Sequence, residues 1–219
     1  MNVLPKITFT LLCSGIVWLA YTWGTANAHY VRVVNQIDGI AAGITTDEIR
    51  KIETSVEQML AMHSSHPHYE VTAGSFYESV AFASDNQTVK QAYLHRALES
   101  YKASASHREV WARTWARVFR VKAGLGEFDD EFSNAVFMAN LYGPKDEGVA
   151  KELVFTLLRN WRQFKPEDIK ISIQQIGNLR DYARFKHIYD YALLIGETSF
   201  LCNLVSVNNI DVNGCKNTI

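Results

Sequence analysis

The sequence lacks the usual marks of a nucleotide-dependent enzyme or of a nucleic-acid-binding protein. Its 22 Lys and Arg residues are matched by 23 Asp and Glu residues, which gives a formal net charge of −1 and no bulk field for a polyanion. It contains no glycine-rich phosphate loop and no Gly-x-Ser-x-Gly element. We therefore expect no cofactor, no nucleic-acid partner and no serine nucleophile.

Long hydrophobic runs are also scarce, and the clearest one lies at the N-terminus. The residues from Ile7 to Trp23 carry no charge, Lys6 precedes them, and the segment 25–28 (Thr-Ala-Asn-Ala) follows with small residues at alternate positions. A positive residue, an apolar stretch and a small-x-small pattern are together typical of an export signal. The rest of the chain is therefore predicted to lie outside the cytoplasm.

The sequence leaves open whether residues 1–28 are removed. The pair Ala26 and Ala28 suits signal peptidase, which would release a periplasmic protein. The alternative is an uncleaved anchor, because the 17 residues of the apolar run are at the short end of what spans a bilayer about 30 Å thick, and its aromatic residues suit an interfacial belt. We expect a single-pass inner-membrane protein with a periplasmic domain. Cys13 lies inside the apolar run, so a lipoprotein is not expected.

Cysteine is rare, and outside the leader it occurs at Cys202 and Cys215, in an Asn- and Val-rich stretch without helical periodicity. In an oxidising compartment this pair predicts a disulfide, which for a loop of this size stabilises by roughly 3 kcal/mol in the chain-entropy model. Two free thiols or half of a metal site are the alternatives. No second Cys or His pair lies nearby to complete a metal site.

The rest of the pattern is helical. Thr45 offers a cap before Asp47 and Glu48, and apolar residues then recur every three or four positions until the helix stops near Pro67. Further helices are predicted over residues 69–83, 87–104, 107–123, 131–142, 145–164, 166–179 and 180–195. No strand pattern competes before residues 200–207. The predicted fold class is all-α.

Segment lengths favour an α-hairpin repeat of the tetratricopeptide kind. Helix pairs recur about every 34 residues, with small residues where two helices must approach. In the best unit, Trp115, Ala116 and Phe119 lie in the first helix, Ala139 lies in the second, and Pro144 closes it. An irregular helical bundle is the alternative, since alanines and aromatics at helical spacing form the core of most helical proteins.

These patterns divide the chain into four parts. Residues 1–28 form a signal anchor or signal peptide, 29–48 a juxtamembrane helix and linker, 49–199 a helical repeat-like domain, and 200–219 a tail closed by the disulfide. The part beyond the leader has the right size for one domain with a sizeable core.

Three segments give the chain a resemblance to a known family. They are residues 76–83 (FYESVAFA), 94–98 (LHRAL) and 111–117 (WARTWAR), which follow the export segment in this order. Together they resemble the small VpsP-type proteins found with bacterial exopolysaccharide biosynthesis clusters, over roughly residues 1–160. The resemblance implies a role in polysaccharide synthesis or export at the inner membrane, without an assigned reaction.

A histidine-rich connection offers a candidate metal site. His63, His66 and His68 lie within six residues, beside Glu70, and such ligands suit a divalent ion such as zinc. They also flank Pro67 in a helix-to-helix connection, where polar residues are expected in any protein. We predict no metal site here.

The pair Glu78-Ser79 resembles the Glu-Ser pair of lytic transglycosylases, whose glutamate acts as an acid on a glycan. Those enzymes need a Gly-rich, Met-Gln-containing stretch after the pair, and none follows Ser79. A second carboxylate at a suitable place is also missing. We therefore expect no enzymatic activity.

The strongest candidate for a binding surface is the helix predicted around residues 111–120. Its arginines fall on one side at spacings of four and three, while tryptophan and phenylalanine fall on another side. Such a row suits an anionic glycan or a lipid diphosphate, through forked hydrogen bonds and stacking. The alternative is a solvated basic face over a buried aromatic one. The candidate partner- or glycan-binding residues are Arg108, Trp111, Arg113, Arg117 and Arg120.

The predicted function is a non-enzymatic, periplasm-facing accessory or scaffold protein, because stacked helical hairpins suit the docking of an extended partner segment. The resemblance implies that it serves exopolysaccharide biosynthesis or export. The expected partners are inner-membrane polysaccharide synthesis or export proteins, and an anionic glycan. The alternative is a direct glycan-binding factor, or a glycan-active enzyme with an unrecognised site.

Overall fold

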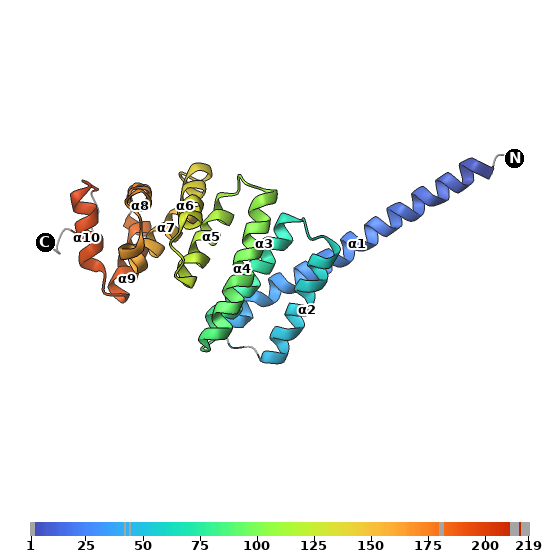
Figure 1. The fold of residues 1–219 in the computed structure, drawn as a ribbon, viewed down its shortest axis with the longest axis horizontal. Coiled ribbons are helices and arrows are strands. Elements are labelled where there is room, and N and C mark those ends of the chain that lie inside the picture. The colour runs from blue at the N-terminus through green and yellow to red at the C-terminus, as the bar shows by residue number, and fades with distance from the viewer. Residues whose placement is uncertain (1–2, 42, 44, 180–181, 211–214, 216–219) are drawn as a thin grey trace. The chain divides into compact units, whose positions relative to one another are not determined.

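The computed structural model describes residues 3–41, 43, 45–179, 182–210 and 215. Over these residues the secondary structure consists of helices and turns, with no strand (Figure 1), which confirms the predicted all-α class. The chain divides into two compact units, Met1–His107 and Arg108–Ile219.

The first unit contains α1 (Val3–Ala41), α2 (Thr46–Met62), α3 (Pro67–Ala83) and α4 (Gln87–His107). The helix α1 has two different halves. From Ile7 to Trp23 its large apolar side chains are exposed, and Figure 1 shows this half extending past the other helices of the unit. Beyond it Ala26, Val33 and Ile40 are buried, in the helix that contacts α2 and α3. α1 is long and apolar enough to span a membrane.

Local sequence explains how the helices of this unit begin and pack. Thr45 Oγ1 accepts a hydrogen bond from the backbone N–H of Glu48 at 3.3 Å, and the Glu48 carboxylate accepts one from the N–H of Thr45 at 2.8 Å, which forms a capping box. Pro67 opens α3, where its fixed φ suits a first helical turn. Gly74 lets α3 approach α4, because a Cβ at this position would lie 2.5 Å from the ring of Tyr101.

The second unit contains α5 (Ala112–Leu125), α6 (Asp130–Tyr142), α7 (Glu147–Asn160), a 3-10 turn (Trp161–Gln163), α8 (Pro166–Asn178), α9 (Tyr182–Leu194) and α10 (Thr198–Val207). Three hairpins form, in which α5 pairs with α6, α7 with α8, and α9 with α10. Successive hairpins pack through equivalent helices, since α5 and α9 both contact α7, and α6 and α10 both contact α8.

Polar contacts between these hairpins follow the spacing seen in the sequence. Arg113 on α5 binds Asp146 before α7, 33 residues later, and the hydroxyl of Ser133 on α6 donates to Asp168 on α8, 35 residues later. Residues about one repeat apart become neighbours when equivalent helices stack. Stacked α-hairpins therefore describe this unit, while the tetratricopeptide type stays a prediction.

Two boundaries differ from those expected. The junction between residues 28 and 29 falls inside the unbroken helix α1, because Ala26 before it and Val33 after it lie in the same buried row. The helical domain expected over residues 49–199 is divided between His107 and Arg108. The second unit begins there because α5 packs on α6 and α7, which follow it in the chain.

The strand-like pattern of residues 200–207 was also misleading, since this stretch is helical in α10. Valine favours strands in isolation. However, Leu201, Cys202 and Val205 are all buried, at the spacing of one helix face. Tertiary burial therefore overrides local propensity at this position.

In the structure Cys202 of α10 is bonded to Cys215, with Cα atoms 5.2 Å apart. Both residues are buried and belong to an apolar cluster that includes Ile176 of α8 and Ile188 of α9. The bond therefore ties position 215 to the core formed by the last two hairpins. The other predicted tail positions, 211–214 and 216–219, lie outside the described residues.

Candidate functional site

The arginine row lies on α5 and faces α7. Arg113 is 74% exposed, and its Nε donates to both carboxylate oxygens of Asp146, at 2.9 and 3.2 Å. Asp146 also caps α7, accepting from the N–H groups of Gly148 and Val149. Burial opposes its negative charge, but the bonds from Arg113 and from these backbone groups hold the pKa of Asp146 below its ordinary value.

A second ion pair joins the same two helices about two turns further along α5. Arg120 donates to Glu152 of α7 at 2.5 Å, and each side chain is about one-third exposed. Together with Arg113, Arg117 and Gly148, these residues border a cleft of about 190 Å³. The structure therefore brings three of the predicted site residues to one cleft and adds one carboxylate, that of Glu152, to its lining.

Asp146 and Glu152 were not among the predicted site residues. Their signal was present, because they stand 33 and 32 residues after Arg113 and Arg120, close to the predicted repeat length of about 34. In a stack of hairpins, an acid one repeat after a base is a candidate partner.

The other two predicted residues, Arg108 and Trp111, are not among those that line this cleft. The guanidinium of Arg108 lies 4.0 Å from the ring centroid of Trp111, a cation–π arrangement. Arg108 is exposed, and Trp111 is half-buried at the start of α5. They form a separate cationic and aromatic surface beside the helix.

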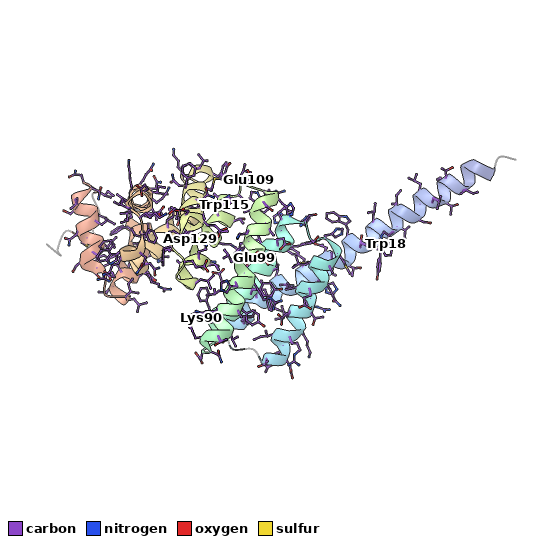
Figure 2. All side chains as sticks on the ribbon, in the orientation of Figure 1. Trp18, Lys90, Glu99, Glu109, Trp115 and Asp129 are labelled. Atoms are coloured by element: carbon purple, nitrogen blue, oxygen red, sulfur yellow. A yellow bond between two sulfur atoms is a disulfide. The ribbon has the colours of Figure 1, made fainter. Side chains whose placement is uncertain are left out.

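The aromatic side of α5 is only partly a core face. Phe119 is completely buried, whereas Trp115 is half-buried and its Nε1 donates to the backbone carbonyl of Glu109 at 2.7 Å. Figure 2 labels Trp115 and Glu109 at the beginning of the second unit. The hydrogen bond from Trp115 therefore holds the segment before α5 against this helix, and Phe119 is the aromatic residue of the core.

Glu78 does not have the setting of a glycosidase acid. It is 4% exposed, and its Oε2 accepts a hydrogen bond from the hydroxyl of Tyr101 at 2.8 Å. That places the carboxylate inside the packing of α3 against α4, where a glycan would have to displace both helices to reach it. Its geometry fits a structural role.

The three histidines at the end of α2 and the start of α3 lie against aromatic rings and against each other. His66 lies 4.2 Å from Tyr69 between ring centroids, and 5.8 Å from His68. Within the described part of the chain, no group of three or more His, Cys, Asp or Glu side chains is placed to hold a metal ion.

Comparison with protein-family models, curated proteins and solved structures finds no match to this chain. The likeness to VpsP-type proteins therefore stays a resemblance carried by the segments quoted above, and function has to be argued from the residues.

Proposed function

We propose that this chain is a non-enzymatic docking protein, held at the periplasmic face of the inner membrane by α1, which serves exopolysaccharide biosynthesis or export. The continuity of α1 is the observation that carries the proposal. Its exposed apolar half and its buried row of Ala26, Val33 and Ile40 belong to one helix. Such a helix joins a membrane span directly to the core of a folded unit.

The same continuity supports retention of the leader. Cleavage after Ala28 would remove Ala26 from the buried row, and would remove Trp23 from its contact with His63, where the ring centroids are 4.4 Å apart. Each loss exposes apolar surface that the folded unit buries. Intact-mass measurement of the protein from membranes should find the chain uncleaved, and a mature start at His29 would disprove retention.

The cleft on α5 supports docking rather than catalysis. Its volume of about 190 Å³ lies below the roughly 300–1,000 Å³ of typical small-molecule sites. Asp146 and Glu152 also offset the charge of Arg113 and Arg120, so the surface presents both signs. A partner protein segment with mixed charge suits this surface better than a uniform polyanion does.

The polysaccharide context rests on the resemblance to VpsP-type proteins. A direct glycan-binding role is the second candidate, and the pairing of Arg108 with Trp111 favours it. An indole face stacks on sugar rings and a guanidinium binds carboxylate groups. If this second role is correct, Trp111→Ala should abolish retention of the protein on immobilised acidic polysaccharide.

Membrane topology is the first test. Lys6 precedes the apolar run and nearly all of the chain follows it, so a periplasm-active reporter fused after Ile219 should be active and a cytoplasm-active reporter silent. The reverse pattern would remove the proposal entirely.

Partner recovery is the second test. The triple variant Arg113→Ala, Arg117→Ala and Arg120→Ala should recover less partner in a crosslinking pull-down from membranes and should lower polysaccharide output. The matched control replaces three other cations of the second unit, Lys145, Lys170 and Lys186, and should behave as wild type. A folded triple variant with normal recovery and output would show that the row is a solvated face.

A further inference from the structure

Several ring side chains gather in the first unit where α1 passes the start of α3. Trp23 lies 4.4 Å from His63 and 5.5 Å from His66, measured between ring centroids. Tyr69 lies 4.2 Å from His66 and 5.6 Å from Tyr30. The group joins the end of the exposed half of α1 to the connection between α2 and α3.

These rings border a pocket of about 470 Å³, lined by side chains of Trp23, Asn27, Tyr30, His66, His68 and Tyr69. The volume lies within the roughly 300–1,000 Å³ typical of ligand sites. Each of these six side chains offers an N–H or O–H group, and none is a carboxylate. The pocket therefore combines aromatic faces with hydrogen-bond donors.

The position of the pocket along α1 fixes its depth relative to a membrane. A hydrocarbon core about 30 Å thick takes about 20 helical residues, which counted from Ile7 ends near Ala26. Trp23 and Tyr30 lie on either side of that point. The pocket would therefore open at the level of the lipid headgroups, where tryptophan and tyrosine are enriched.

We propose that this pocket binds the phosphate-bearing headgroup of a membrane phospholipid. The proposal rests on the anchoring of α1 proposed above. Imidazole N–H groups of His66 and His68 and the amide of Asn27 donate to the phosphate oxygens. The faces of Trp23 and Tyr30 suit the amine of a zwitterionic headgroup, by cation–π attraction.

Two further observations fit this ligand. Nε2 of His63, whose ring lies against Trp23, is buried and has no hydrogen-bond partner among the described residues, a state that is rare without a polar ligand or water nearby. The acid next to Tyr69 in sequence, Glu70, is buried, and burial raises its pKa to about 7. Its repulsion of a phosphate at neutral pH is thereby reduced.

Native mass spectrometry of the full chain tests the proposal. The protein is released from nanodiscs of phosphatidylethanolamine and phosphatidylglycerol, and its bound lipids are counted. The variant His66→Ala/His68→Ala should retain at least about tenfold less phospholipid than wild type, since it removes two charge-assisted hydrogen bonds. The control variant His95→Ala/His187→Ala replaces two exposed histidines of α4 and α9 and should retain lipid as wild type does.

A second variant keeps the test decisive if loss of His66 loosens the fold. Asn27→Leu leaves the ring packing in place, removes the amide donor and narrows the pocket, so it should also lose lipid at unchanged helicity. Equal lipid retention in the pocket variants and the control would overturn the assignment. Tight binding of inorganic phosphate alone would overturn the lipid as the source. The topology reporter is independent of both results, so a failed anchor and a failed pocket are distinguishable.

Discussion

Replacing Lys122 with Met should destabilise the second unit by about 2–4 kcal/mol. Lys122 is 2% exposed, and its ammonium donates to Glu127, Asp129 and Glu131 at 2.9, 3.0 and 2.9 Å. Burial opposes its charge, but the hydrogen bonds to Glu131, Glu127 and Asp129 raise the pKa of Lys122 above its ordinary value. The cation therefore holds the turn between α5 and α6 together at pH values below its unfolded pKa at which the three acids are ionised.

The magnitude follows from how the partners are solvated. Removing one member of a buried ion pair costs about 3–5 kcal/mol, because the other member is left buried and charged. Here the three acid side chains are 37%, 55% and 40% exposed, so water can solvate the unpaired carboxylates and the loss of stability is smaller. Repulsion among three carboxylates without a cation adds to the remainder.

Thermal unfolding of the full chain in detergent, with hydrogen exchange measured over α5 and α6, provides the assay. The control is Lys165→Met, because Lys165 pairs with a fully exposed Asp130 at 2.5 Å and such pairs contribute little. Increased exchange in α5 and α6 should occur for the Lys122 variant alone. Equal effects of the two variants would contradict a stabilising role for the buried cation of Lys122.

The pH dependence provides a second check. Burial opposes ionisation of Asp129, but bonds from the N–H of Phe132 and from Lys122 hold the pKa of Asp129 below its ordinary value. A carboxyl group with a depressed folded pKa contributes stability above its unfolded pKa of about 3.9, and loses it as pH falls through the folded value. The difference between wild type and Lys122→Met should therefore be full at neutral pH and shrink below about pH 4.

Three further outcomes are expected. In a denaturant titration, Phe119→Ala should lower the free energy of unfolding by about 3–5 kcal/mol. Trp115→Ala should lower it clearly less, because Phe119 is fully buried and Trp115 is not; equal losses would contradict this difference. Thiol labelling of the denatured, non-reduced protein should modify neither Cys202 nor Cys215, which are bonded, and labelling of both would rule out the disulfide in the native protein. Burial raises the pKa of Glu70 to about 7, so ionisation of this carboxyl group lowers the stability of the protein as pH rises from the unfolded pKa through that value. Thermal unfolding should therefore find Glu70→Gln more stable than wild type by on the order of 1–3 kcal/mol at pH 8, and no more stable below pH 4.

The features that depend on local chemistry can be predicted from the sequence alone. The uncharged run up to Trp23 predicts a helix exposed to an apolar environment, whatever follows it. Thr45, Glu48 and Pro67 place the ends of α2 and the start of α3 where the structure has them, because caps and proline act within one helical turn. The all-α class can be predicted in the same way, since apolar residues recur every three or four positions along each segment.

Tertiary structure decided what depends on residues distant in the chain. The helix α10 forms because Leu201 and Val205 are buried by other helices, and the charge of Arg113 is offset by an acid 33 residues away. Equally, Trp23 meets His63 because α1 continues past residue 28 into a folded core. Local propensity cannot specify such contacts, because their free energy comes from surfaces brought together by folding.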